Sequence, residues 1–229
     1  MADVARLPRV GILIPSTDTT VEIELPELLA GRATCHFARM KLESVTVEGL
    51  TAMEVEALAE AALFADINVD VVLFACTSGT FIYGPEYEAD LASRLAAAAG
   101  APVVTTANAM AQALALRGTN VRLRTPYDEA LTAAEVGYLS AHGLAVSSTR
   151  SLDITVDDEI AAVTADTLRE LATGNDDADV IMLSCTNLRT LPLIAEISAA
   201  TGLPVVTSNT AAAARVIAVL GGEPAISQR

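Results

Sequence analysis

The chain has 229 residues, of which 52% are apolar, and its formal net charge is −15 at pH 7. Because this charge would repel a phosphate backbone, we expect no nucleic-acid partner. No apolar run reaches the roughly 18 residues of a membrane span, and the first ten residues lack the apolar region of a signal peptide. With three cysteines, an odd number, the sequence predicts a cytoplasmic protein with free thiols and no membrane association.

Apolar strands alternate with helical stretches along the chain. We predict helices over residues such as 54–67 and 87–99. Strands that are apolar at consecutive positions and separated by helices are typical of parallel sheets covered on both faces. Arg122 and Arg124 alternate within one strand, so we expect that strand to have an exposed or interface-facing side. The predicted strands cover residues 10–14, 34–40, 70–75, 102–105, 120–125, 144–150, 179–184 and 204–207.

The sequence repeats itself in two halves. DVVLFACT at 70–77 matches DVIMLSCT at 179–186, and PVVTTAN at 102–108 resembles PVVTSNT at 204–210. We therefore predict two pseudo-symmetric α/β domains, residues 1–115 and 116–229, each with a mostly parallel four-stranded sheet flanked by helices. The segment 208–229 is expected to pack back on the first half. Ligands of open α/β sheets bind beyond the carboxyl ends of the strands, so the site is expected between the halves.

Few residues are available for metal or cofactor chemistry. His36 and His142 are the only histidines, and neither has a second histidine or a cysteine pair at metal-ligand spacing. Lys41 is the only lysine and has no phosphate-binding glycines around it, which disfavours a pyridoxal phosphate enzyme. The usual nucleotide-binding and serine-nucleophile motifs are missing. We therefore expect no metal and no cofactor.

Two cysteines end matching strands and are the predicted catalytic residues. Cys76 and Cys185 are each followed by threonine and, we expect, by the start of a helix. A thiolate is the reactive form, and the positive end of a helix lowers the pKa of a thiol from about 8.5 towards neutrality. Two thiols on opposite faces of one carbon would remove a proton from one side and return it on the other. Cys35 lies in mid-strand and is assigned to the core, with His36 exposed or hydrogen-bonded.

Small polar residues follow both cysteines. Thr77, Ser78, Thr186 and Asn187 are of types that cap helices, and this structural role accounts for them by itself. Hydroxyls and backbone N–H groups at such positions also bind carboxylate oxygens and stabilise an enediolate-like charge. Since the whole molecule is acidic, local dipoles of this kind would have to hold an anionic substrate. The predicted ligand is thus a small carboxylate.

These motifs resemble a known family. GILIPSTDTTVE at 11–22, ACTSGTF at 75–81 with GPEYE at 84–88, TPY at 125–127 and LSCTN at 183–187 are similar to the aspartate/glutamate racemase superfamily. Within it, the chain looks most like the branch of maleate cis–trans isomerase and arylmalonate decarboxylase. The resemblance implies two α/β domains, no cofactor, a homo-oligomer (dimer or tetramer), catalytic cysteines at 76 and 185, and a substrate-binding tyrosine at 127. Our candidate substrate-binding residues are Ser16, Asp18, Thr77, Ser78, Tyr127, Thr186, Asn187 and Asn209.

Two features bear on the reaction. The decarboxylases have glycine where this chain has Cys76, so a pair of thiols favours an isomerase or racemase. Thr77 and Ser78, however, match the carboxylate-binding pair of the decarboxylases. Asp18 stands where maleate isomerase has a carboxylate-binding asparagine. An ionised Asp18 would repel a dicarboxylate unless it is protonated or turned away, or it would pair with a substrate amine.

The sequence thus predicts an enzyme: a cofactor-independent isomerase or racemase that uses two opposed cysteines on a small carboxylate, as maleate cis–trans isomerase does. Three alternatives stay open. The first is an arylmalonate-type decarboxylase with Cys185 as the proton donor. The second is a racemase of an Asp- or Glu-like amino acid. The third is a non-catalytic protein that binds carboxylates.

Overall fold

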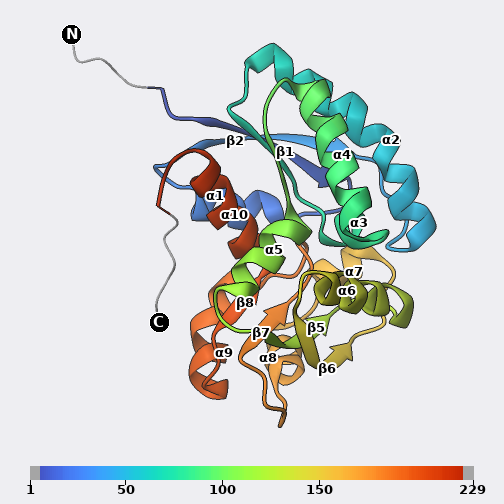
Figure 1. The fold of residues 1–229 in the computed structure, drawn as a ribbon, viewed down its shortest axis with the longest axis vertical. Helices are drawn as coiled ribbons and strands as arrows, with labels where there is room; N and C mark the ends of the chain where they lie inside the picture. The colour runs from blue at the N-terminus through green and yellow to red at the C-terminus, as the bar shows by residue number, and fades with distance from the viewer. Residues whose placement is uncertain (1–5, 224–229) are drawn as a thin grey trace.

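Two four-stranded parallel sheets form the framework of the molecule (Figure 1). The computed structural model describes residues 6–223. The first sheet has the order β2-β1-β3-β4 and the second has the order β6-β5-β7-β8, which is the same topology used twice. The predicted fold class is confirmed. The strands are β1 (Arg9–Pro15), β2 (Thr34–Met40), β3 (Val71–Phe74), β4 (Val103–Thr105), β5 (Asn120–Thr125), β6 (Ala145–Ser151), β7 (Val180–Leu183) and β8 (Val205–Thr207).

Helices connect successive strands and cover the sheets (Figure 1). In the first half they are α1 (Val21–Leu28), α2 (Val47–Leu63), the 3₁₀ turn η1 (Phe64–Ile67), α3 (Thr77–Phe81), α4 (Gly84–Ala99) and α5 (Thr106–Ala115). In the second half they are α6 (Glu129–Ala141), α7 (Asp157–Ala161), α8 (Ala165–Ala172), the 3₁₀ turn η2 (Leu191–Leu193), α9 (Ile194–Thr201) and α10 (Ser208–Val219).

Each predicted strand agrees with the observed one to within one residue at either end. The physical reason is burial of the central strands on both faces. All four residues of β3 and all four of β7 are buried, so nearly every position has to be apolar. The outer strands β2 and β6 are only partly buried, and they carry polar residues such as Arg39 and Ser148.

Gly11 allows β1 to approach the turn η1 closely. A Cβ atom at this position would lie 2.7 Å from the Phe64 ring, which is itself buried in the core. We expect Gly11→Ala to destabilise the fold by about 1–3 kcal/mol, because overpacking forces the ring or the strand to move. Gly137 is the matched control, since it is exposed within helix α6 and has no atom within 4 Å of its would-be Cβ.

Gly137→Ala is expected to stabilise the protein by about 0.5–1 kcal/mol through helix propensity. Urea unfolding of both variants checks the pair. Equal effects of the two substitutions would contradict the close-packing account of Gly11.

The two halves meet through helices on the inner sides of both sheets. Helix α10 contacts α5 and α1, as well as strands β3 and β4 of the first sheet, and α6 contacts α3 and α4 (Figure 1). The division at residues 115 and 116 stays a prediction. Residues 224–229 of the segment expected to pack back lie outside the described range.

The expectation that Arg122 and Arg124 face solvent or an interface is wrong. Their side chains are only 4% and 1% exposed. Arg122 pairs with Asp176 at 2.9 Å, and Arg124 donates to the backbone carbonyls of Leu171 and Thr173 at 2.6 and 2.8 Å. A buried guanidinium is tolerated when its donors are satisfied in this way, which the strand pattern does not reveal.

Hydrogen bonds hold Asp176 in its charged form. Burial by itself raises the pKa of this carboxyl group, but hydrogen bonds from Arg122 and Ser148 outweigh it and lower the pKa to about 2. Burial and the neighbouring charge of Arg122 lower the pKa of Arg124 to about 10. Arg122, Arg124 and Asp176 therefore form a charged network that connects β5 to the segment before β7.

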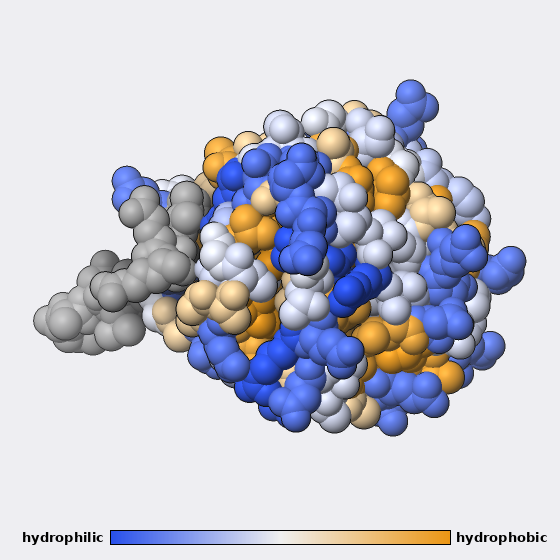
Figure 2. Space-filling model, turned by 90° about the horizontal axis from the view of Figure 1, so that it is seen from below, coloured by the Kyte–Doolittle hydropathy of each residue, from blue (hydrophilic) through white to orange (hydrophobic). Residues whose placement is uncertain are grey.

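On the face drawn in Figure 2, hydrophobic residues lie in separate patches among hydrophilic ones. Within residues 6–223 no helix has both the length and the apolarity needed to cross a bilayer. The large exposed apolar residues come from several elements and are Leu7, Ile23, Val55, Leu63, Tyr83, Leu116 and Val156.

Candidate active site

The predicted site residues follow the carboxyl ends of the two inner strands of each sheet. Asp18 follows β1, Cys76 follows β3, Tyr127 follows β5 and Cys185 follows β7. All four are buried. Because the carboxyl ends of parallel strands lie at one edge of a sheet, each sheet brings its own pair of residues together.

Cys76 is held at the start of helix α3. It is the N-cap residue of this five-residue helix, and its side chain is 4% exposed. Burial raises the pKa of the Cys76 thiol to about 12. Hydrogen bonds from the Gly79 backbone and from Ser78, whose Oγ lies 3.8 Å from the sulfur, lower it by less. The expected lowering towards neutrality is therefore wrong, because desolvation outweighs one short turn of helix.

Cys185 sits in an unusual backbone conformation. Its φ angle is 120°, a value that residues other than glycine rarely adopt, and its N–H donates to Ser208 Oγ at 3.0 Å. Such conformations cost about 1–3 kcal/mol and gather at functional sites. Burial raises the pKa of this thiol well above its ordinary value. The expected helix start is also wrong here, because a turn follows Cys185 and the next helical residues begin with η2.

The same neighbouring carboxyl groups affect the pKa of both thiols. The carboxyl groups of Asp157 and Asp18 raise the pKa of both cysteines, after burial as the main cause. Burial raises the pKa of Tyr127 well above its usual value, and charge on either cysteine raises it further. These shared influences indicate that both thiols lie near the same carboxyl groups. That their sulfurs oppose each other across one substrate stays a prediction.

Ser208, the first residue of α10, connects the two cysteine segments. Its Oγ accepts a hydrogen bond from the Cys185 N–H at 3.0 Å and another from Thr77 Oγ1 at 2.9 Å. Thr77 is the residue after Cys76, so a single hydroxyl fixes both strand ends. Sequence reasoning missed Ser208, although it follows β8 directly within the repeated PVVT segment.

Asp157 is a second buried carboxyl group that sequence reasoning missed. It begins helix α7, and its Oδ2 accepts a hydrogen bond from Thr17 Oγ1 at 2.7 Å. Burial raises its pKa, whereas hydrogen bonds from Thr17 and Asn187 lower it by less. No motif marks this residue, because it lies in a loop-rich stretch that the tertiary fold brings to Thr17.

Several predicted binding residues use their polar atoms within the protein. Asn187 accepts hydrogen bonds from the backbone N–H groups of Thr19 and Thr20 at 3.1 and 3.3 Å, and it donates to the backbone carbonyl of Asp157. The structure therefore gives Asn187 a role in joining the two halves. These internal hydrogen bonds account for the position of Asn187 without a role in substrate binding.

Asn209 and Ser16 are similarly engaged. The amide N–H₂ of Asn209 donates to Glu24 Oε2 at 2.7 Å and to the carbonyl of Thr186, while Ser16 Oγ accepts from the Leu42 N–H at 3.1 Å. Both side chains are thus held by contacts within the protein. The Oδ1 of Asn209 has no partner within residues 6–223.

The Tyr127 hydroxyl lies near the Cys185 thiol. Its ring is buried against Phe81, with ring centroids 6.0 Å apart, and in the part of the chain that the structure describes the hydroxyl has no hydrogen-bond partner of ordinary geometry, although the nearby Cys185 side chain affects its pKa. A buried phenol without a partner is costly unless a ligand or water completes it. That this hydroxyl binds a substrate stays a prediction.

Glu135 is a third buried carboxyl group close to the site. It lies on α6, is fully buried, and neither carboxyl oxygen has a hydrogen-bond partner among the described residues by geometry. Burial raises its pKa to about 8, and the neighbouring Ser184 lowers it by less. A negative charge on Glu135 raises the pKa of Tyr127. The apolar context of α6 hid this residue from sequence reasoning.

Cys35 is the cysteine outside the site. It is half-buried in β2 and packs against the core, so its assignment to the core is confirmed only in part. Its neighbour His36 lies 3.0 Å from Thr34 Oγ1, as the predicted hydrogen-bonded state requires.

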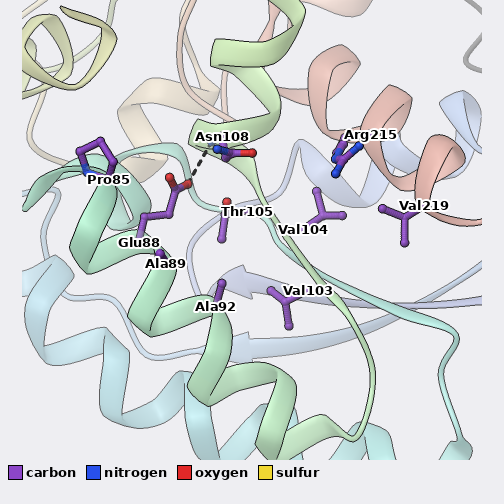
Figure 3. Close-up of a pocket in the computed structure, with 10 residues that line it drawn as sticks. All are labelled: Pro85, Glu88, Ala89, Ala92, Val103, Val104, Thr105, Asn108, Arg215 and Val219. Atoms are coloured by element: carbon purple, nitrogen blue, oxygen red, sulfur yellow. Dashed lines mark hydrogen bonds between the residues drawn. The ribbon is translucent and has the colours of Figure 1, made fainter. Parts of the chain in front are cut away.

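A cavity of about 190 Å³ lies between α4, β4, α5 and α10 (Figure 3). The Glu88 carboxylate accepts a hydrogen bond from the Asn108 N–H at 2.9 Å, drawn dashed in Figure 3, and another from the Tyr138 hydroxyl. Glu88 thus joins three helices. Neither Cys76 nor Cys185 lines this cavity, so it is separate from the thiol site.

Comparison with known proteins decides the family. The family model for arylmalonate decarboxylase matches residues 10–228. The chain belongs to this family. Among relatives of the family, a maleate isomerase from Pseudomonas putida is 32% identical over 96% of this chain and 95% of its own length. The arylmalonate decarboxylase of Bordetella bronchiseptica is 29% identical over 94% of this chain and 89% of its own length.

Solved structures of the family agree. A maleate isomerase from Pseudomonas putida with maleate matches with a TM-score of 0.90 and 29% identity, covering 95% of this chain and 93% of its own. A mutant of the Nocardia farcinica maleate cis–trans isomerase, with a covalently bound succinylcysteine intermediate, matches with a TM-score of 0.89 and 29% identity over 94% of each chain. The predicted recognition of this branch of the superfamily is confirmed.

Proposed function

We propose that this protein is a cofactor-independent cis–trans isomerase of a small cis-enedioate such as maleate. The observation that carries the proposal is the pair of buried thiols, Cys76 and Cys185, at matched strand ends beside the same carboxyl groups. Maleate isomerases are similar over nearly the whole chain, and one of them holds a succinylcysteine intermediate.

In the proposed reaction, one of the two thiols has lost its proton before the chemistry begins. The Cys76 thiolate adds to one alkene carbon, and the π electrons move to the other carbon and its carboxylate as an enediolate. The Cys185 thiol donates its proton to that carbon and becomes a thiolate. The C–C bond, now single, rotates. Cys185 then takes a proton back, the double bond re-forms, and Cys76 leaves as thiolate.

The site helps this reaction in two ways. The Tyr127 hydroxyl, which has no partner of ordinary geometry within residues 6–223, is a hydrogen-bond donor for a carboxylate whose charge increases in the enediolate. The raised pKa of Cys185 suits a group that has to carry a proton to the substrate. The raised pKa of Cys76 means that the thiolate needed for the addition is a minor form of this thiol at neutral pH, formed by loss of its proton to solvent.

The test is incubation of the purified protein with maleate, followed by proton NMR. We expect the vinyl signal of maleate to be replaced by that of fumarate without added metal or cofactor. Running the reaction in heavy water reports whether protons exchange during turnover. Absence of fumarate at high protein concentration would refute the proposal.

An arylmalonate-type decarboxylase is the second candidate. Thr77 and Ser78 favour it, as does the relative from Bordetella bronchiseptica. In this reading Cys185 alone protonates the enediolate that remains after carbon dioxide leaves. Carbon dioxide release from phenylmalonate, with no isomerisation of maleate, would support this candidate over the first. Exchange of the α-proton of aspartate or glutamate would support an amino-acid racemase.

We also propose that the protein is a homo-oligomer, a dimer or a tetramer, in the cytoplasm. The family resemblance and the three free cysteines support this proposal. Analytical ultracentrifugation tests the oligomeric state, and a monomer at micromolar concentration would contradict it.

A further inference from the structure

The two carboxyl oxygens of Asp18 differ in their hydrogen bonding. The side chain is fully buried, and Oδ1 accepts hydrogen bonds from the N–H groups of Thr20 at 2.9 Å and Val21 at 3.0 Å. Oδ2 is equally buried and has no hydrogen-bond partner of ordinary geometry within residues 6–223, although the Thr186 side chain lies close enough to lower the pKa of the carboxyl group. A buried oxygen left without a partner is costly, so its natural complement is a ligand.

Asp18 belongs to the thiol site. Its charge raises the pKa of both Cys76 and Cys185, and Asp157 on helix α7 acts on all three groups. If both carboxyl groups were ionised, two negative charges would face any dicarboxylate that entered. Such a pair would oppose binding of the substrate that the proposed function requires.

The basic side chain that contacts the Asp18 backbone is directed away from its carboxyl group. Arg39 on β2 donates to the backbone carbonyls of Ser16 and Asp18 at 2.9 and 3.1 Å, and it pairs with Glu22 of α1. Its side chain is partly exposed. No basic side chain is among the main influences on the pKa of Asp18. An anion at this site therefore has to be held by neutral donors.

We propose that Asp18 binds one carboxylate of the substrate as a neutral carboxylic acid, which donates a hydrogen bond from the O–H on Oδ2. This inference rests on the proposed function and names how the same site accepts a dianion. The two backbone donors at Oδ1 leave Oδ2 as the oxygen that carries the proton.

Electrostatics supports this protonation state. Burial raises the pKa of Asp18 to about 7, and the charge of Asp157 raises it as well, against the lowering effect of the hydrogen bonds at the carboxyl group. A substrate carboxylate adds a further negative charge, which raises the pKa again when it binds. Binding of a dicarboxylate therefore takes up a proton from solution.

The test is calorimetric binding of succinate, a dicarboxylate with no double bond to react, to the intact protein between pH 6 and pH 9. We expect the affinity to fall at least tenfold over this range as Asp18 ionises in the free protein. Titrations in buffers of different ionisation enthalpy at pH 8 should show uptake of close to one proton.

The Asp18→Asn variant distinguishes a protonated Asp18 that binds substrate from an Asp18 with a merely structural role. Asparagine keeps an oxygen for the two backbone donors and offers an N–H in place of the O–H. We expect the fall in succinate affinity with pH to disappear in this variant. An unchanged fall in Asp18→Asn, or no fall in the unmodified protein, would overturn the inference.

Asp157→Asn tests the neighbouring charge. Removing that charge lowers the pKa of Asp18, so the fall in affinity should begin at a lower pH. Disappearance of the fall would identify Asp157 as the titrating group and overturn the inference. Tighter binding of aspartate than of succinate at pH 9, lost in Asp18→Asn, would also overturn it in favour of an ionised Asp18 that binds an amine.

The outcomes distinguish the two levels of proposal. Binding of succinate that depends on Asp18 and pH, without formation of fumarate from maleate, would leave the inference standing and refute the isomerase. Isomerisation of maleate together with succinate binding that is independent of pH would support the isomerase and overturn the inference about Asp18.

Discussion

Replacement of Cys76 by alanine is expected to lower the rate of fumarate formation from maleate by about 10³-fold or more. The reason is that alanine has no nucleophile to add to the alkene, and the remaining groups cannot generate a single bond for rotation. Cys185→Ala is expected to cause a comparable loss, because the enediolate then has no proton donor on the other side. Initial rates by NMR, together with circular dichroism to confirm folding, measure both effects.

Cys35→Ala is the matched control, since Cys35 is a half-buried free cysteine on β2 outside the site. Its rate should match that of the unmodified protein. Cys76→Gly discriminates between the two candidate reactions, because a decarboxylase that uses Cys185 alone tolerates glycine at this position. Unchanged turnover of maleate in both Cys76→Ala and Cys185→Ala would remove the basis of the isomerase proposal.

Glu135 is expected to make the stability of the protein depend strongly on pH. The folded state keeps this carboxyl group protonated up to about pH 8, whereas in the unfolded chain it ionises near the ordinary glutamate pKa of 4.5. Between these values the folded state binds more protons, so the free energy of unfolding falls as pH rises. The stability that Glu135 contributes is fully present below pH 4.5, and about 5 kcal/mol of it is lost by the time the pH has risen above 8.

Glu135→Gln should lack this loss. We expect the difference in unfolding free energy between the variant and the unmodified protein to shift in favour of the variant by several kcal/mol from pH 5 to pH 8.5. Urea unfolding at several pH values measures it. Glu129→Gln is the control, because Glu129 is exposed at the start of the same helix. Parallel stability curves for Glu135→Gln and the unmodified protein would show that Glu135 ionises freely in the folded state.

The repeated strand ends were the informative part of the sequence. A strand buried on both faces has to be apolar at nearly every position, and this rule located β3 and β7 within one residue. The matched cysteines followed directly from those strand ends. The same rule predicted two similar sheets, which the structure has in identical order.

The same reasoning failed where buried charged side chains are stabilised by partners that are distant in the sequence. Arg122 and Arg124 break the apolar pattern of β5, and only the fold shows that Asp176 and backbone carbonyls at the end of α8 satisfy them. Likewise, nothing in the sequence predicts that the charge of Asp157 acts on Asp18, because the two residues belong to different halves of the chain.

The sequence by itself determined the local periodicity, the duplicated α/β framework and the position of a thiol at each of two equivalent strand ends. Only the tertiary structure decided which polar atoms meet at that site, with Ser208 joining the two cysteine segments and the Tyr127 hydroxyl left without a partner of ordinary geometry among the described residues. It also decided the protonation states. Desolvation depends on how completely the fold surrounds a group, and here it raises the pKa of both thiols where a helix terminus alone would lower it.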